Sequence, residues 1–88
     1  MIGEIVICTR GRESGRAFYV LQEEENFLYL ADGKRRTLEQ PKRKKMKHAV
    51  VFGRFAHDVT ERLEENRPLC NRDLRRALAA FRDQETGR

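Results

Sequence analysis

Three short apolar runs, each followed by turn residues, occupy the first third of this chain and require a fold that begins with β-strands. The runs are EIVICT (4–9), RAFYVLQ (16–22) and FLYLA (27–31). Runs of this length, rich in Val, Ile, Phe and Tyr and bounded by polar or glycine-containing turns, are typical of strands. After residue 54 the apolar spacing changes to three and four residues, which indicates helices. We therefore expect a mainly β chain with a C-terminal α part.

A hairpin is expected around Asp32-Gly33, because both central positions of a two-residue hairpin turn need a positive φ and this dipeptide favours it. The loop would set the cross-strand pairs Ala31–Lys34, Tyr29–Arg36 and Phe27–Leu38. Phe27, Tyr29, Arg36 and Leu38 would then share one face. Leu28 and Leu30 lie on the other face, so both sides of the hairpin are partly apolar. This pattern favours a small barrel with something packed on its outside.

Two short helices are expected after the strands. The stretch FAHDVTERLEENRP places Asp58 as an N-cap with a Glu three residues later, and the helix should end before Pro68. A second helix should follow Asn71 as its N-cap. Its apolar stripe, suited to covering the outside of a barrel, consists of Leu74, Ala77, Leu78 and Phe81. The last residues, 84–88, are expected to fray.

The length of 88 residues leaves room for one small core. The expected fold is a small SH3-like β-barrel at residues 1–54, followed by a helical extension of the same domain at residues 55–88. No run of about 18 apolar residues is present, so membrane insertion is not expected. We expect a cytoplasmic location. Cys8 and Cys70 are expected as reduced thiols.

Positive charge is concentrated in residues 34–48, which hold eight Lys or Arg and one acid, Glu39, for a local charge of +7. The whole chain carries +5, so the rest of it sums to −2. Charge confined to one segment is typical of a surface for a polyanion, with RNA, DNA and anionic lipid as candidates. The tetrapeptide KRKK also fits the loose pattern of a nuclear import signal.

The basic segment is expected to run from a loop at Pro41 into a strand, because proline cannot donate to a ladder. A period of two places Met46, His48, Val50 and Phe52 on one face, with Met46 facing inward, and Lys45 and Lys47 outward. Tyr29, expected beside Arg36, is a candidate for stacking an unpaired base.

A second candidate surface is the stretch TRGRESGRAF, in which Gly11 and Gly15 lie four residues apart among Arg10, Arg12 and Arg16. Glycines let a loop adopt positive φ and let a phosphate approach the backbone, and arginines can bind phosphate through two bonds. The alternative is an ordinary turn with solvated arginines.

Catalytic and metal-binding patterns are weak. His57 and Asp58 are adjacent, which does not supply the geometry of a nucleophile, a base and an orienting group. Four residues of zinc-binding types lack the spacing that presents two ligands from one local element: Cys8, His48, His57 and Cys70. We expect no enzyme, no cofactor and no metal.

Two stretches carry a family resemblance. GEIVICTRGRESGRAFYVL resembles a KOW motif, and with YLADGKRRTLEQPKRKKMKHAVV the match covers about residues 3–52. Together they resemble small bacterial KOW-domain RNA-binding proteins, which are similar to a large-subunit ribosomal protein family of archaea and eukaryotes. NRDLRRALAAF resembles the C-terminal helix of these proteins. Many KOW motifs have a further glycine where this chain has Ala17 and Phe18.

The resemblance implies an SH3-like barrel that binds structured RNA, plausibly ribosomal, without catalysis, and with the ribosome or ribosomal proteins as possible partners. The alternative is a protein-interaction module of the transcription or translation machinery. The expected RNA-binding residues are Arg10, Gly11, Arg12, Gly15, Arg16, Lys34, Arg35, Arg36, Lys42, Arg43, Lys44, Lys45, Lys47 and His48.

Overall fold

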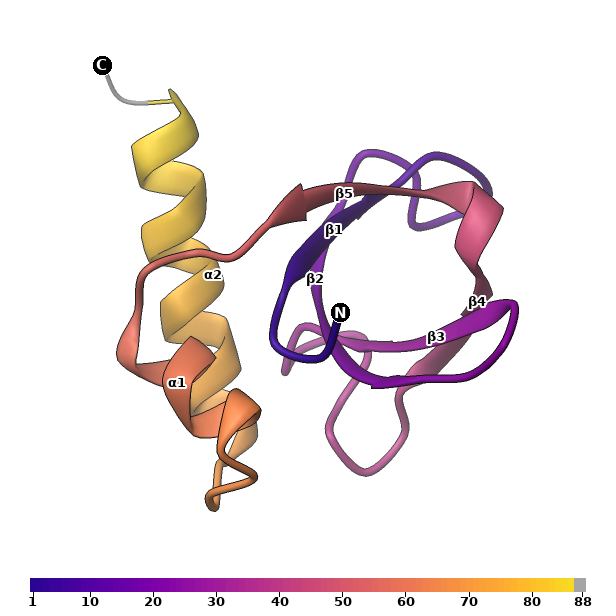
Figure 1. Cartoon of the computed structure of the whole chain (residues 1–88). Helices are drawn as coiled ribbons and strands as arrows, with labels where there is room; N and C mark the ends of the chain where they lie inside the picture. The colour runs from indigo at the N-terminus through magenta and orange to yellow at the C-terminus, as the bar shows by residue number, and fades with distance from the viewer. Residues whose placement is uncertain (87–88) are drawn as a thin grey trace.

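The structure, a computed structural model, describes residues 1–86 and contains a five-stranded antiparallel sheet followed by two helices (Figure 1). The helical elements are η1, a 3-10 helix (Met46–His48), α1 (Asp58–Glu64) and α2 (Asn71–Thr86). The strands are β1 (Ile5–Cys8), β2 (Ala17–Glu23), β3 (Phe27–Ala31), β4 (Lys42–Lys45) and β5 (Ala49–Gly53). A mainly β chain with a C-terminal α part is confirmed.

The strand order is β4-β3-β2-β1-β5, and Figure 1 shows the sheet curled around its own interior. The ladder register shifts between Ile5 and Val6 in β1 and between Val20 and Gln22 in β2. Such irregularities bend a strand and increase its twist, which lets a sheet of short strands curl. The two edge strands, β4 and β5, are joined by η1. No ladder between them is found among the described residues.

The concave side of the curled sheet holds one apolar cluster. Alternate residues of β1, β2 and β3 point into it, as the period of two requires. Its buried members are Val6, Cys8, Phe18, Val20, Leu28 and Leu30. Met46 packs against this cluster, so the expectation that Met46 faces inward is confirmed.

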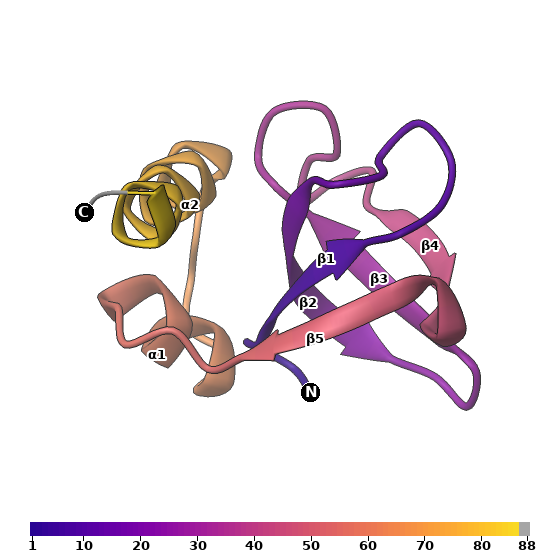
Figure 2. The ribbon, with the colours of Figure 1, turned by 90° about the horizontal axis from the view of Figure 1, so that it is seen from above.

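The convex side of β1, β2 and β3 is covered by the helices (Figure 2). Ile5, Tyr19 and Ala31 belong to the same buried cluster as the apolar stripe of α2. That stripe is the predicted one, Leu74, Ala77, Leu78 and Phe81. The predicted cover for the outside of the sheet is therefore confirmed, and the strands and the helices both contribute to this second cluster, which we name the outer cluster.

The expected hairpin at Asp32-Gly33 is wrong. Strand β3 pairs with β4 instead, with the pairs Phe27–Lys45, Leu28–Lys44, Tyr29–Arg43 and Leu30–Lys42. Gly33 has a φ of 80°, but among the described non-glycine residues only Asn66 has a positive φ, so Asp32 does not form the expected turn. Instead, Asp32 Oδ1 accepts hydrogen bonds from the backbone N–H groups of Lys34 and Arg36. Residues 32–41 form a loop.

That loop is held by α2 rather than by strand pairing. Figure 2 shows it reaching toward the start of the helix. Asn71 Oδ1 accepts a hydrogen bond from Leu38 N at 2.8 Å, and Asn71 Nδ2 donates to Glu39 Oε1 at 2.8 Å. Leu38 packs against the outer cluster. The face expected to combine Phe27, Tyr29, Arg36 and Leu38 does not exist.

The single strand expected after the loop at Pro41 is interrupted, because η1 separates β4 from β5 and β5 begins only at Ala49. Met46 N donates to Asn26 O and Ala49 N donates to Met46 O, which makes residues 46–48 a helical turn. The alternation is displaced as a result, and Val50 and Phe52 are exposed rather than inward-facing.

The ends of the helices also differ from expectation. The N-cap of α1 is His57, whose Nδ1 accepts from Val59 N at 3.0 Å, and Asp58 is the first helical residue. Helix α2 starts at Asn71 itself, and Asp73 Oδ2 accepts a hydrogen bond from Cys70 N. Residues 84–86 continue α2 rather than fray, and residues 87–88 of that expectation lie outside the described part.

Candidate nucleic-acid interface

The loop between β1 and β2 (residues 9–16) is compact. Gly15 N donates to Cys8 O at 2.8 Å and Ser14 N donates to Gly11 O at 3.1 Å. Gly11 and Gly15 have φ values of 79° and 83°, a region that L side chains rarely adopt. Three arginines of this loop are exposed: Arg10, Arg12 and Arg16.

Glu13, which no sequence pattern singled out, fastens this loop to the rest of the sheet. Its side chain is buried, and its Oε2 accepts from Arg36 Nη2 at 2.6 Å and from Arg36 Nε at 3.1 Å. Lys44 Nζ lies 3.8 Å from Glu13 Oε1. The hydrogen bonds from Arg36 are the main reason that the pKa of Glu13 is lowered. One carboxylate thus joins the β1–β2 loop, the β3–β4 loop and β4.

Lys44 is the second fastening of the loop. Only 8% of Lys44 is exposed, and its Nζ donates to the carbonyl oxygen of Arg10 at 2.8 Å. A Cβ atom on Gly11 would lie 3.3 Å from that Nζ. The absence of a side chain at Gly11 therefore lets Lys44 reach the loop backbone.

Cations from two segments meet around His48. Thr9 N donates to His48 O at 2.9 Å, which sets η1 against the start of the β1–β2 loop. The pKa of His48 is lowered, first by partial loss of solvent and then by nearby cations. Those cations are Arg10, Lys47, Lys45 and Lys44. The two basic stretches of the sequence are therefore neighbours in space.

The outer side of β4 combines a cation with an aromatic ring. The Arg43 guanidinium carbon lies 3.5 Å from the centroid of the Phe27 ring, a cation–π contact. Arg43 Nε is 3.7 Å from Glu24 Oε1, and the Tyr29 hydroxyl donates to the same oxygen at 3.1 Å. Tyr29 therefore lies opposite Arg43 and not beside Arg36, which corrects its expected placement.

An open pocket of about 540 Å³ lies where η1 follows β4. Its lining residues are Asn26, Phe27, Lys45, Met46 and Lys47. The lining thus combines two exposed lysines with the apolar side chains of Phe27 and Met46. Such a pocket can receive a flat, uncharged ring while the lysines contact an attached anion.

The fourteen residues expected to bind RNA fall into four groups. Arg36 and Lys44 are occupied by Glu13 and by the Arg10 carbonyl, so their charges already have partners. Arg16 and Lys34 line a different groove, and Arg35 is exposed on the same loop as Lys34. Gly11 and Gly15 shape the β1–β2 loop. The remaining residues, which we name the basic surface, are Arg10, Arg12, Lys42, Arg43, Lys45, Lys47 and His48.

Within the described residues, no ion pair to an acid involves Arg10, Arg12, Lys42, Lys45 or Lys47. Arg43 is the member of the basic surface that has an acidic partner, Glu24. Cations gathered without counter-ions repel one another, and an incoming polyanion relieves this repulsion.

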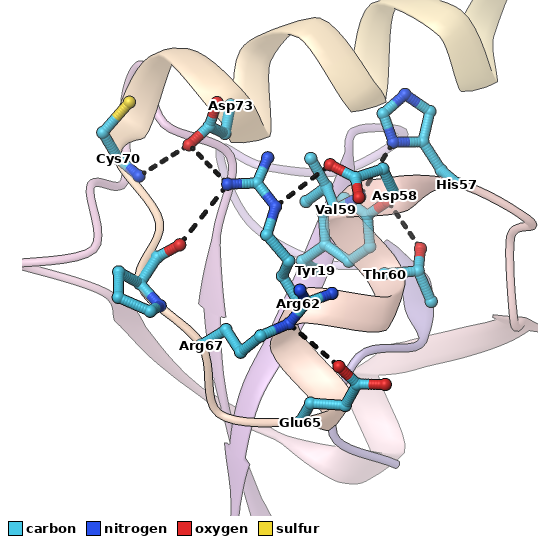
Figure 3. A network of polar contacts seen from close by, with 11 residues as sticks. Tyr19, His57, Asp58, Val59, Thr60, Arg62, Glu65, Arg67, Cys70 and Asp73 are labelled. Carbon is cyan, nitrogen blue, oxygen red and sulfur yellow. Dashed lines mark hydrogen bonds and ion pairs between the residues drawn. The ribbon is translucent and has the colours of Figure 1, made fainter.

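A polar network on the opposite side of the molecule links α1 to α2 (Figure 3). Arg62 Nε lies 3.1 Å from Asp58 Oδ2, and Arg62 Nη1 lies 3.5 Å from Asp73 Oδ2. The Tyr19 hydroxyl and the Thr60 hydroxyl form a buried hydrogen bond of 2.9 Å. His57, considered above beside Asp58, accepts the cap bond from Val59 N. These contacts stabilise the helices.

Across residues 1–86, no group of three or more His, Cys, Asp or Glu side chains could hold a metal ion. Within the same residues, every helix is too short or too polar to cross a bilayer. No protein-family model matches the chain, and no curated protein matches it significantly.

Proposed function

We propose that the chain is a non-catalytic RNA-binding module of the KOW type, with its curled sheet forming an SH3-like barrel, and that it acts in the cytoplasm on structured RNA such as ribosomal RNA. The observation that carries the proposal is that Arg10, Lys45 and Lys47 gather around His48, and that within residues 1–86 none of the three forms an ion pair with an acid. Phosphate contacts supply much of the affinity in nucleic-acid binding, and an array of unpaired cations suits them.

The chemistry of the basic surface favours RNA over a lipid headgroup. Arg43 lies over Phe27, and Phe27 lines a pocket together with Lys45 and Lys47. A base in a loop or bulge of folded RNA can enter such a pocket while its phosphates bind the lysines, since unpaired bases are often bound on aromatic rings. Fixing the β1–β2 loop through Glu13 and Lys44 keeps this surface rigid, which reduces the entropic cost of binding.

A protein-interaction module is the second candidate, and one observation favours it. The edge strand β5 exposes Val50, Val51 and Phe52 at 57%, 46% and 47%. Exposed apolar residues on an unpaired strand edge can bind another polypeptide.

One experiment separates the two candidates. The protein is crosslinked in cells and recovered, and the attached RNA is sequenced. A Lys45→Ala/Lys47→Ala variant and a Val51→Ser variant are treated in the same way. The RNA proposal predicts that the lysine variant loses crosslinked RNA and the Val51 variant keeps it. Recovery of a protein partner that depends on Val51 and not on the lysines, with no RNA above background, would support the alternative.

A further inference from the structure

A second concave site lies away from the basic surface, between α2 and the sheet. It is a groove of about 630 Å³ formed by residues of β1, β2, β5 and α2 and of the loops that follow β1 and β3. Four of its twelve lining residues are cations: Arg16, Lys34, Arg75 and Arg82. Two are acids, Asp32 and Glu85, and the others are apolar or glycine. The groove thus combines net positive charge with an apolar floor.

The charge of this groove is available to an incoming anion. Within the described residues, no ion pair to an acid involves Arg16, Lys34 or Arg75. Arg75 Nη1 donates to Gly33 O at 2.6 Å, which holds the guanidinium at the groove, and its other N–H donors have no acceptor within residues 1–86. Asp32 Oδ1 already accepts two backbone hydrogen bonds, from Lys34 N and Arg36 N at 2.9 Å each.

An exposed aromatic ring at the same groove packs against the buried core. Phe52 of β5 is 47% exposed, and its ring makes an edge contact with the buried Phe81, with centroids 4.6 Å apart and an interplanar angle of 82°. The ring of Phe81 also makes an edge contact with the ring of Phe55, with centroids 5.4 Å apart. An exposed ring that already packs against a buried ring loses less conformational entropy when a flat partner stacks on it.

We propose that this groove binds a single-stranded segment of RNA, with a base stacked on Phe52 and adjacent phosphates on Arg16, Lys34 and Arg75. A basic groove with an aromatic platform is how proteins bind single strands without strong sequence preference. A duplex keeps its bases paired, so it cannot offer one to the ring. The inference rests on the proposed RNA-binding function. It adds a second contact of different chemistry, so a folded RNA would bind the basic surface while a flanking single strand enters the groove.

The test uses the full chain and two fluorescent probes, an RNA hairpin without overhangs and a ten-nucleotide oligo(U), in fluorescence anisotropy titrations. The groove variants are Phe52→Leu, which keeps an apolar contact with Phe81, and Arg16→Ala/Lys34→Ala. The basic-surface variant is Lys45→Ala/Lys47→Ala. The matched control is Arg72→Ala/Arg76→Ala, two exposed arginines of α2 that do not line the groove.

We expect each groove variant to weaken oligo(U) binding roughly tenfold, since stacking on one ring changes affinity by about that factor or more. Hairpin binding should change less than twofold in the groove variants and fall in the basic-surface variant. Unchanged oligo(U) binding in both groove variants, with hairpin binding still lost in the basic-surface variant, would overturn this inference alone. Failure of both RNAs to bind above the control would overturn the proposed function as well. Binding of an oligo-glutamate peptide that depends on Arg16 and Lys34, without oligo(U) binding, would assign the groove to an acidic protein partner and overturn the RNA assignment.

Discussion

Lys44 Nζ donates a hydrogen bond to the backbone oxygen of Arg10 across 34 residues of sequence, at 2.8 Å. One cation of the most basic stretch is therefore buried and holds the β1–β2 loop, so it does not belong to the basic surface. Glu13 completes this fastening, because its carboxylate binds Arg36 and lies 3.8 Å from Lys44. These contacts fix the backbone next to Arg10 and Lys45, whose side chains are exposed.

The Glu13 fastening predicts a pH-dependent loss of stability. Glu13→Gln should lower the free energy of unfolding by about 2 kcal/mol at pH 7, since it leaves buried Lys44 without its anion. The pKa of Glu13 is lowered in the folded protein, so its contribution is fully present above the ordinary value of 4.5 and is lost as pH falls through the lowered value. Urea unfolding at pH 7 and at pH values below 4 measures this. Ser14→Ala, at an exposed neighbour, is the control. A gap between wild type and Glu13→Gln that is equal at both pH values would contradict the role of the charge.

Gly33 is predicted to be the least replaceable of the glycines that the structure describes. A Cβ atom at this position would meet the backbone oxygen of Asn71, and φ is 80°. Gly33→Ala should destabilise the protein by about 3 kcal/mol or more, because both strain and displacement of α2 contribute. Gly15 is the matched control, since its φ is 83° and a Cβ atom added there would have no heavy atom within 4 Å. Gly15→Ala should cost about 1 kcal/mol. Equal midpoints of urea unfolding for the two variants would refute the close contact.

The buried hydrogen bond between Tyr19 and Thr60 predicts coupled effects. Tyr19→Phe and Thr60→Val should each lower the free energy of unfolding by about 1–2 kcal/mol, because each leaves one buried hydroxyl without its partner. The double variant should lose less than the sum, with a coupling of about 1 kcal/mol. A double-mutant cycle by chemical denaturation measures the coupling, and strict additivity would show that the two hydroxyls do not depend on each other.

His48 predicts a pH dependence of RNA affinity. Its pKa is lowered by desolvation and by the surrounding cations. A bound phosphate would offset the repulsion from these cations and favour the charged imidazolium, so it would raise this pKa. Binding should therefore take up a proton, so RNA affinity should rise as pH falls from about 7.5 to about 5.5, by severalfold. In the His48→Gln variant the rise should disappear. The measurement is an anisotropy titration at each pH. A rise of the same size in His48→Gln would exclude His48 as its origin.

The sequence predicts the parts of this fold that depend on local pattern. Strands β1, β2 and β3 follow from apolar runs with β propensity, and the buried stripe of α2 follows from its helical spacing. The prediction of a hairpin at Asp32-Gly33 fails because tertiary contacts determine the conformation of that segment. Asn71 binds the backbone of Leu38, and Gly33 packs closely against the start of α2.

The sequence likewise predicts some residues of the candidate site and misses others. Local charge density selects Lys45 and Lys47 without knowledge of the fold. Glu13 could have been noticed as the only acid in TRGRESGRAF, but its burial depends on Arg36 and Lys44, which are distant in sequence. The role of Arg75 at the second groove depends on how α2 packs on the sheet, which periodicity does not give.

The salt dependence of RNA binding tests the role of the basic surface most directly. If the six Arg and Lys side chains of the basic surface neutralise about six phosphates, the slope of log affinity against log salt for an RNA hairpin should be roughly −4 to −5. Lys45→Ala/Lys47→Ala should make that slope shallower by about 1.5, while Arg72→Ala/Arg76→Ala should leave it unchanged. A slope near zero, or an equal change in both variants, would contradict the claim that the basic surface binds RNA.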